Sequence, residues 1–337
     1  PKVSILLPVF NAGAFLDQCL DSLARQTLSD YEIVAVDDGS TDASRSILHR
    51  RSRQDGRLRV LSRDHLGLIP TLNAGLERCR GTWVARMDAD DIAHPRRLEL
   101  QVDTLEATGG PDIVSSLVAH FPRRTLKEGF RIYEHWLNSL VTHEAISRER
   151  FIESPLPHPS VVLRLVDMVE AGGYRDLGWP EDYDLWLRLA AAGKRFAKVP
   201  RVLYLWRHHE KRLTTTDRRY SVEKFLACKA HHLARGPLEG ISNVVVWGAG
   251  QTGRRLSKHL IRGGVQLRSF IDIDPRKIGG TLRGFPVHSP DRLPALLTSA
   301  RDTVILSAVS SRGARALIRD RLSDLGLTEG RQYWCVA

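Results

Sequence analysis

Strand-like and helix-like segments alternate through the first hundred residues, and this alternation constrains the fold more than any other feature. Apolar runs typical of strands lie at residues 3–9, 31–36, 58–61 and 82–87, and the segments between them have the apolar spacing of helices. Such alternation predicts an α/β fold with a mostly parallel sheet flanked by helices. Ligands of such sheets bind beyond the carboxyl ends of the strands.

Three carboxylates follow the fourth of these strands directly, in the run Val84-Ala85-Arg86-Met87-Asp88-Ala89-Asp90-Asp91. The spacing of Asp88 and Asp90 lets one carboxylate reach Mn²⁺ or Mg²⁺ and the other a sugar hydroxyl, because hard cations take oxygen ligands and share them with phosphates. The alternative is a solvated acidic loop before a helix that starts near Pro95, since Asp is a common helix starter. The motif by itself leaves both interpretations open.

The bulk composition indicates a globular protein of about two domains. The chain has 337 residues, of which 42% are hydrophobic and 26% charged, and it has no apolar run of membrane-spanning length. Its first residues lead directly into a strand pattern, so we expect no signal peptide. The cysteines are scattered without a metal-type pair, which favours a reduced, cytoplasmic protein. They are Cys19, Cys79, Cys228 and Cys335.

Positive charge is concentrated in the last third of the chain. From residue 241 onward there are 15 Lys and Arg against 7 Asp and Glu, which gives +8 of the total net charge of +11. A basic unit of this kind suits peripheral contact with an anionic membrane, and the alternative is simply a solvated Arg-rich surface. Nucleic acid is not expected as a partner, because no binding motif or interleaved aromatic pattern is present.

A helix break at Arg235-Gly236-Pro237 predicts the boundary between two domains, residues 1–238 and residues 239–337. Within the first, the pattern predicts helices over 133–151 and 181–192 and a strand over 199–206. We therefore expect the second domain to begin with the strand at 243–247.

The second domain carries a dinucleotide-type fingerprint. Gly248, Gly250 and Gly253 follow the apolar strand, and Asp272 ends the next one. These glycines let a phosphate approach a helix N-terminus, which predicts a compact Rossmann-like unit. NAD(P)-dependent catalysis, nucleotide or nucleotide-sugar binding, and a structural or docking role all remain open. No dehydrogenase-like substrate site is evident after residue 290.

Six short motifs in the first domain, taken together, resemble the family 2 glycosyltransferases, which have the GT-A fold. Each motif is weak alone, but their order and spacing make a strong combined signal that extends to about residue 235. The motifs are Pro8–Asn11, Val36–Asp42, Leu72–Gly75, Met87–Asp91, Glu181–Trp186 and Trp206–His209. The resemblance implies a metal-dependent, inverting transfer of a sugar from a nucleotide-diphosphate donor, with a UDP-sugar favoured, to a hydroxyl acceptor.

The resemblance also implies roles for individual residues. It assigns Asp182 as the catalytic base, which takes the proton from the acceptor hydroxyl. It assigns Asp90 and His209 to the metal ion, and Asp88 to the ribose and sugar of the donor. The further residues that it implies at the donor nucleotide are Pro8, Val9, Asn11, Asp38, Asn73 and Arg207.

Three residues are candidates for the acceptor side, namely Glu181, Trp186 and His158. Each has a structural alternative: Glu181, like Asp182, is a favourable acid at a helix start, Trp186 suits a core, and His158 suits a loop between two prolines. A His that follows a strand, such as His209, is also usually structural.

The family implies a setting in surface polysaccharide or glycoconjugate biosynthesis at the cytoplasmic membrane face. The expected acceptor is a saccharide or a lipid-linked saccharide, and a homo-oligomer is left open. Two other functions also remain: a nucleotide-sugar-binding regulatory protein, and a bifunctional enzyme with NAD(P)-dependent chemistry in the second domain. The segments 272–280 and 284–287 resemble the small Rossmann-like domain at the front of bacillosamine-type sugar acetyltransferases.

Overall fold

The computed structural model describes residues 1–210, 212–298 and 302–337, which form two compact units. The first unit contains residues 1–147, 155–177 and 181–216, and the second contains residues 148–154, 178–180 and 217–337. Each unit is described separately below. The helix at 222–234 groups with the second unit, and the boundary between residues 238 and 239 stays a prediction.

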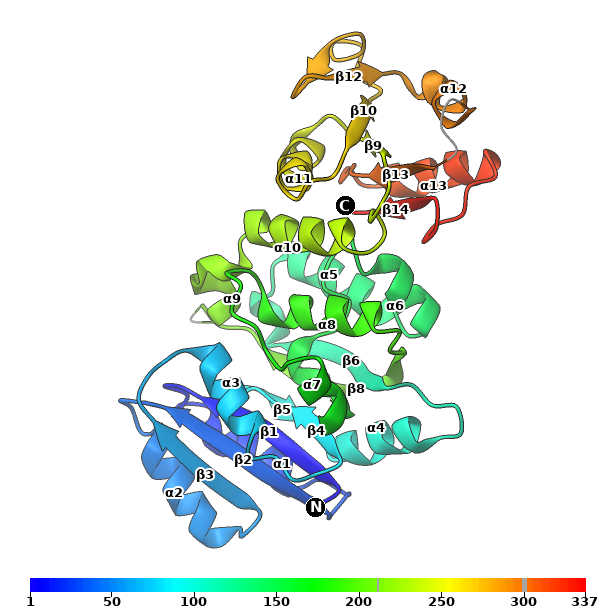
Figure 1. Ribbon diagram of the computed structural model, residues 1–337. Helices are drawn as coiled ribbons and strands as arrows, with labels where there is room; N and C mark the ends of the chain where they lie inside the picture. The colour runs from blue at the N-terminus through cyan, green and yellow to red at the C-terminus, as the bar shows by residue number, and fades with distance from the viewer. Residues whose placement is uncertain (211, 299–301) are drawn as a thin grey trace. The chain divides into compact units, whose positions relative to one another are not determined.

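The chain up to residue 216 forms the following elements, labelled as in Figure 1: β1 Val3–Val9, α1 Leu16–Ala24, β2 Tyr31–Asp38, α2 Ser44–Gln54, β3 Leu58–Arg63, α3 Leu68–Leu76, β4 Trp83–Arg86, β5 Ile92–Ala93, α4 Arg97–Glu106, β6 Ile113–Phe121, η1 Arg123–Thr125, α5 Glu128–Ser139, α6 His143–Glu149, η2 His158–Ser160, β7 Val162–Arg164, α7 Leu165–Glu170, α8 Glu181–Ala191, β8 Phe196–Arg207 and α9 Leu213–Thr216.

The remainder forms η3 Arg218–Tyr220, α10 Val222–Ala234, β9 Asn243–Trp247, α11 Gln251–Arg262, β10 Leu267–Ile271, β11 Thr281–Leu282, β12 Phe285–His288, η4 Pro290–Arg292, α12 Leu293–Thr298, β13 Thr303–Ser307, α13 Ala314–Asp324 and β14 Tyr333–Cys335.

The sheet of the first unit has the strand order β3-β2-β1-β4-β7-β6-β8-β5. Strands β1, β2, β3 and β4 run parallel, with Val9 opposite Asp37 and Leu6 opposite Arg86, while β7 and β5 are antiparallel to their neighbours. The carboxyl ends of β1, β2 and β4 therefore lie side by side at one edge of the sheet. This arrangement confirms the expected mostly parallel α/β fold.

Alternate residues of these buried strands face opposite helical layers, because side chains alternate along a strand. Ile5 and Ile33 pack in the same core as α1, α2 and α4, whereas Leu6 and Val34 pack in the same core as α3, α7 and α8. Figure 1 shows α2 and α3 on opposite sides of the blue strands. Gly75 lets α3 come close to this sheet, because a Cβ atom there would meet Leu6 Cδ1 and lie 2.9 Å from Val36 Cγ2.

The middle of the first unit differs from the sequence-based expectation. The single helix expected over 133–151 is divided into α5 and α6, and β6 was not predicted. The break lies where the Lys198 amide of β8 donates a hydrogen bond to Val141 O at 2.9 Å. Thr142 begins the new helix, since its hydroxyl accepts from the Ala145 amide at 3.3 Å. Pairing with the sheet therefore overrides the local helical pattern.

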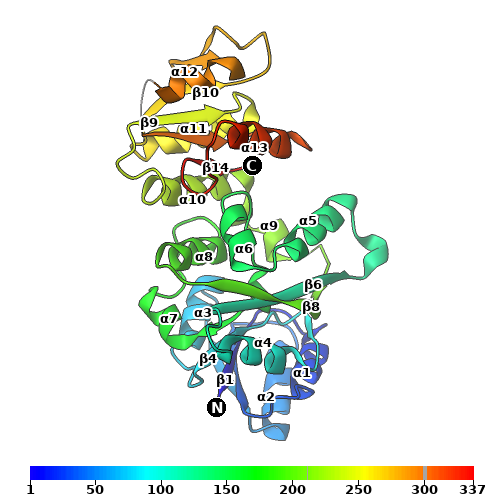
Figure 2. The same cartoon turned by 90° about the vertical axis from the view of Figure 1, so that its right-hand side faces the viewer.

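The second unit has the strand order β11-β12-β10-β9-β13-β14, with β9 parallel to both β10 and β13. The chain moves outward on one side of β9 and then crosses to the other, so the order reverses between β9 and β13 (Figure 2). In open sheets, ligands bind at such a reversal. This fold agrees with the expected Rossmann-like unit. Within the described parts of the chain, no helix has the length and apolarity needed to cross a bilayer.

The close approach at Gly75 generates a prediction about stability. Gly75→Ala should lower the free energy of unfolding by about 1–3 kcal/mol, because the added methyl group overpacks α3 against β1 and β2. Gly129→Ala in α5 is the matched control: no atom lies within 4 Å of the added Cβ, so this change should raise stability by about 0.5–1 kcal/mol. Urea denaturation of both variants checks the prediction, and two effects of the same sign would contradict it.

Candidate active site

The acidic run at the end of β4 lies at the edge where β1 and β2 also end. Carboxylate oxygens of Asp88, Asp90 and Asp91 lie within 4.8 Å of one another. Asp88 and Asp90 are partly exposed, with side-chain exposures of 33% and 26%, whereas Asp91 is buried. The cluster therefore offers two accessible carboxylates above a third that belongs to the framework.

Asp90 is paired with a residue from the far end of the unit's sequence. Its Oδ2 lies 2.7 Å from His209 Nε2, just beyond the end of β8. Burial alone raises the pKa of Asp90, but the hydrogen bond and charge of His209 outweigh it, so the pKa lies below the usual value. The structure thus brings together the two residues predicted to hold a metal ion, and their role in metal binding stays a prediction.

Arg207 ties the end of β8 to the acidic run. Its amide donates to Asp91 Oδ1 at 2.6 Å, and its Nε donates to the carbonyl of Asp90 at 2.6 Å. The guanidinium also lies over the rings of Phe15 and Phe121, at 4.6 and 4.5 Å from their centroids. Arg207 therefore fixes the positions of Asp90 and Asp91 by hydrogen bonds that involve the backbone. Its predicted contact with the donor nucleotide stays a prediction.

Asp91 is an internal anchor of the cluster, which the sequence did not distinguish from its neighbours. Its Oδ2 accepts a hydrogen bond from the Tyr204 hydroxyl at 2.8 Å, and that hydroxyl accepts one from the Asp88 amide at 3.2 Å. Burial, followed by the charges of Asp90 and Asp88, raises the pKa of Asp91 well above its usual range. The one sequence feature that could have indicated this role is the position of Asp91 at the end of the acidic run, directly after Asp90.

Arg86 is a second residue that sequence reasoning missed. It is 3% exposed, its Nη2 donates to Asp88 Oδ1 at 2.6 Å, and its Nη1 donates to the carbonyl of Met87. Its Nε has no hydrogen-bond partner among the described residues. A buried guanidinium held by one carboxylate strongly restrains that carboxylate, because separating the pair would leave a buried charge uncompensated. Arg86 therefore leaves Asp88 Oδ2 as the oxygen available to a ligand.

The predicted donor-nucleotide side is formed by loops after β1, β2 and β3. Asp38 is 2% exposed, and its two oxygens accept from the amides of Leu66 and Gly67 at 3.1 and 2.9 Å. Asn11 has a positive φ of 49°, and its Oδ1 accepts from the Thr41 amide at 2.9 Å. Asp38 and Asn11 thus hold these loops together, and their contact with the donor nucleotide stays a prediction. Pro8 and Val9 form the buried end of β1 beside them.

Asn73 clamps the backbone of the segment before α8. Its Nδ2 donates to Tyr174 O at 2.8 Å and its Oδ1 accepts from Tyr174 N at 3.0 Å. The Tyr174 hydroxyl lies 2.8 Å from His158 Nε2, and His158 Nδ1 lies 3.9 Å from Glu181 Oε1. Burial, with a smaller effect from Arg86, lowers the pKa of His158 well below its usual value. His158 is therefore buried in its neutral form. Glu181 is 1% exposed, so both residues belong to the interior behind the site.

Asp182 lies in the first turn of α8, and its Oδ1 accepts a hydrogen bond from the Tyr183 amide at 2.7 Å. It is partly exposed. Burial is the main cause that raises the pKa of Tyr174, Arg86 opposes it, and the charges of Glu181, Asp182 and Asp88 add smaller upward effects. Trp186 is 2% exposed within the core beside α3 and α7, which favours the core alternative over an acceptor contact.

The glycine fingerprint of the second unit has the expected geometry. A Cβ at Gly253 would clash with the carbonyl of Gly248, whereas the space around Gly250 is open. Asp272 Oδ2 accepts from the Ala249 amide at 2.8 Å and pairs with Lys277 Nζ at 3.0 Å. The acid that would hold a ribose in a dinucleotide site is thus already engaged with a lysine. Nucleotide binding by this unit stays a prediction.

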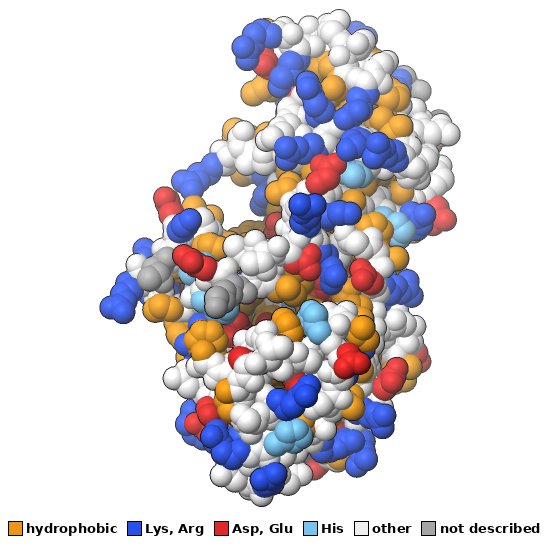
Figure 3. All heavy atoms as spheres, turned by 90° about the vertical axis from the view of Figure 1, so that its left-hand side faces the viewer, with side chains coloured by type: hydrophobic (Ala, Val, Ile, Leu, Met, Phe, Trp, Pro, Cys, Tyr) orange, Lys and Arg blue, Asp and Glu red, His pale blue; other side chains and the backbone are white. Residues whose placement is uncertain are grey.

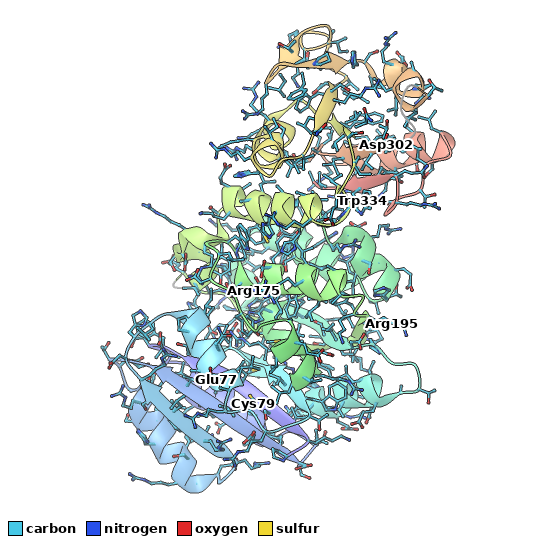
Figure 4. All side chains as sticks on the ribbon, in the orientation of Figure 1. Glu77, Cys79, Arg175, Arg195, Asp302 and Trp334 are labelled. Atoms are coloured by element: carbon cyan, nitrogen blue, oxygen red, sulfur yellow. The ribbon has the colours of Figure 1, made fainter. Side chains whose placement is uncertain are left out.

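A cavity of about 430 Å³ lies elsewhere in the second unit, at the amino ends of β9 and β13; Figure 4 labels Asp302 there. Its walls include both polar and apolar residues, and they lie at the opposite end of the strands from the glycines. This cavity therefore has no connection with the fingerprint. It is lined by Ile241, Asp302, Thr303, Val304, Arg331 and Gln332.

Comparison with known proteins agrees with this geometry. The chain is 35% identical over 207 residues to the amylovoran biosynthesis glycosyltransferase AmsE of Erwinia amylovora, covering 59% of this chain and 74% of that protein. It is 28% identical over 206 residues to the UDP-Gal:alpha-D-GlcNAc-diphosphoundecaprenol beta-1,3-galactosyltransferase of Escherichia coli, covering 60% of this chain and 73% of that protein.

A crystal structure of S. aureus TarS residues 1–349 in complex with UDP-GlcNAc has the same fold, with a TM-score of 0.57 at 18% identity, covering 78% of this chain and 72% of that one. The family of CoA binding domains matches residues 239–323, and the likeness of this part to sugar acetyltransferases stays a prediction. The family described as glycosyl transferase family 2 matches residues 4–173. The chain therefore belongs to glycosyl transferase family 2 and is a glycosyltransferase.

Proposed function

We propose that the first unit transfers a sugar, with inversion, from a nucleotide-diphosphate donor to a hydroxyl of a saccharide or lipid-linked saccharide acceptor. The observation that carries this proposal is the pair formed by Asp90 and His209 within an acidic cluster at the carboxyl end of a parallel strand. Asp182 is a further partly exposed carboxylate, in the first turn of α8. The site thus has accessible carboxylates for two distinct tasks.

The donor set of the cluster fits a hard divalent cation, Mn²⁺ or Mg²⁺. Asp90 and His209 would hold the ion, since their ligand atoms already lie 2.7 Å apart and both side chains are partly exposed. A bound ion supplies positive charge that stabilises the leaving diphosphate. Asp91 does not join this set, because Tyr204 and Arg207 already occupy its oxygens.

Asp182 is the proposed base. An inverting transfer is a single displacement at the anomeric carbon, in which one carboxylate takes the proton of the attacking hydroxyl. Asp182 lies in the first turn of α8, where the helix dipole is favourable to a carboxylate, and its Oδ1 accepts a hydrogen bond from the Tyr183 amide. Its side chain is partly exposed, as a base that meets an acceptor hydroxyl must be.

The names of the relatives guide the proposal for substrates. One relative is named for UDP-Gal and a diphosphoundecaprenol-linked acceptor, and one solved neighbour was crystallised with UDP-GlcNAc. We therefore favour a UDP-sugar donor and a role in polysaccharide or glycoconjugate assembly, with peripheral membrane contact on the cytoplasmic side. A purely regulatory, sugar-nucleotide-binding role is less well supported, since the predicted base and metal-binding residues are all present.

The second unit is a candidate nucleotide-binding module rather than a redox enzyme. Open space at Gly250 lets a phosphate approach α11, and the Lys277–Asp272 pair favours a phosphorylated ligand over a free ribose diol. Thermal-shift measurements on the whole protein with CoA, NAD⁺, NADPH and UDP, each with and without Mn²⁺, test both units, since a ligand of the native state raises the melting temperature. A shift with NAD⁺ or NADPH would favour the bifunctional alternative.

Asp182→Asn should abolish transfer while donor binding persists, because asparagine keeps the shape but cannot accept the proton. We expect the rate constant kcat to fall by roughly 10²–10⁴-fold, with the affinity for UDP unchanged by calorimetry. Glu170→Gln, an exposed acid of α7, is the control and should leave both quantities intact. Equal loss of binding and turnover in the Asp182 variant would exclude its role as base.

Asp90→Ala should remove the dependence on metal together with activity. UDP should then stabilise the protein to the same small extent with and without Mn²⁺, because the variant lacks the carboxylate proposed to hold the ion. Asp103→Ala, an exposed acid on α4, should retain the metal-dependent shift in melting temperature. If the Asp90 variant still showed the full metal-dependent shift, the assignment would be wrong.

Arg86 should act through Asp88, and a double-mutant cycle checks this. Arg86→Met and Asp88→Asn should each raise the KM for the donor at least about tenfold, and the double variant should be little worse than the poorer single one, because directly contacting residues couple. Arg164→Met, on the neighbouring β7, is the exposed control. Additive losses would show that Arg86 does not position Asp88. Unfolding curves for the parent and all four variants separate this effect from loss of the fold.

A further inference from the structure

Helix α11 divides sharply into a buried side and a basic side. Its buried residues, Gly253, Leu256, Ser257 and Leu260, recur at helical spacing and pack toward the sheet of the second unit. The opposite side carries a row of basic residues, and the helix contains no Asp or Glu. Lys and Arg side chains gather on this face of the second unit in Figure 3. The row consists of Arg254, Arg255, Lys258 and Arg262.

Most of this positive charge is not compensated. Lys258 pairs with Glu223 of α10 at 3.0 Å, and His259 contacts the same carboxylate at 2.9 Å. Within the described chain, Arg254, Arg255 and Arg262 have no carboxylate partner, and all three are exposed. The Arg283 guanidinium donates to the carbonyl of Arg254 at 3.0 Å, which adds a further charge to this face. The face therefore attracts an anion that α11 and its neighbours do not supply.

The length of the basic row on α11 favours an extended anionic surface over a single phosphate group. At 1.5 Å per residue, Arg254 and Arg262 are about 12 Å apart along the helix. A single phosphate at the start of the helix would contact only one end of that row. A flat, extended anionic surface would contact all of it.

Exposed apolar side chains accompany the charges. Ile261 is 37% exposed beside Arg262, and Val222 is 63% exposed in the first turn of α10. Lys258 and His259 contact Glu223, so the two apolar residues belong to the same end of the α10–α11 pair. Basic and apolar side chains on one helical face are typical of proteins that lie on a membrane surface, where aliphatic groups enter the headgroup region. This pairing favours lipid over a nucleic acid.

We propose that the face formed by Arg254, Arg255, Arg262 and Ile261 binds the surface of an anionic phospholipid bilayer. The proposed function includes peripheral contact with a membrane, and this inference rests on it only in identifying the face of the protein that makes that contact. Its physical basis is the uncompensated charge of α11, which is independent of the acidic cluster in the first unit. Binding should weaken as salt rises, because exposed charges are screened.

The test compares two triple variants of the full chain that remove equal charge from the same unit. One variant replaces Arg254, Arg255 and Arg262 with Gln. The control variant replaces three exposed arginines outside α11 with Gln, namely Arg292, Arg321 and Arg331. Co-sedimentation with vesicles of phosphatidylglycerol in phosphatidylcholine should show binding by the parent and by the control. The α11 variant should bind roughly 100-fold more weakly, since each basic residue near such a surface contributes a several-fold factor. Pure phosphatidylcholine should bind none of the three proteins.

Three results would overturn the proposal: no binding of the parent to anionic vesicles, equal weakening in the two triple variants, or binding of duplex DNA through α11 without vesicle binding. Transfer to a water-soluble acceptor is measured on the same proteins and should be unaffected in both variants. Vesicle binding without any transfer would count against the proposed function and still support this inference. Sugar transfer by a parent protein that does not bind vesicles would support the proposed function and contradict this inference.

Discussion

Carboxylates that follow strand β4 cannot be left near the protein interior without partners that donate hydrogen bonds or carry positive charge, and this constraint organises the first unit. Asp88 is held by Arg86, Asp90 by His209, and Asp91 by the amide of Arg207. Burying a charge is costly unless it is paired and hydrogen-bonded. The partners are recruited from β4 itself and from the end of β8, far away in sequence. The proposed site is therefore the place where a central strand and a late strand are tied together.

These partners also give Asp88, Asp90 and Asp91 different surroundings, although the three residues are of the same type. Asp91, with its pKa raised by burial and by its acidic neighbours, is enclosed by Tyr204 and the β8 backbone. Asp90 has its pKa lowered by His209 and stays ionised and accessible. Asp88 presents one oxygen because Arg86 occupies the other. One short acidic run thus yields a framework residue, a candidate metal ligand and a candidate sugar or ribose contact.

Much of the first unit was predictable because its signals are local. The strand expected over residues 3–9 is observed as Val3–Val9, and the acidic run follows the fourth strand, β4, at the edge of the sheet where β1 and β2 also end. Arg86 was not predicted, because an arginine inside an apolar strand looks like a solvent-facing residue until its burial is known. The division of the helix expected over 133–151 was also missed, since it depends on a hydrogen bond from Lys198 in a distant strand.

The amino-acid sequence by itself determined the alternation of strands and helices, the position of the acidic run at a strand end, and the two-unit organisation, because these depend on periodicity and residue type. Only the tertiary structure decided which carboxylates are partly exposed and which are buried. Whether Asp38, Asn73 or Trp186 faces a ligand or the interior depends on loops and helices that pack against it from elsewhere in the chain. A side chain's surroundings are set by contacts between segments far apart in sequence, and no local pattern encodes those contacts.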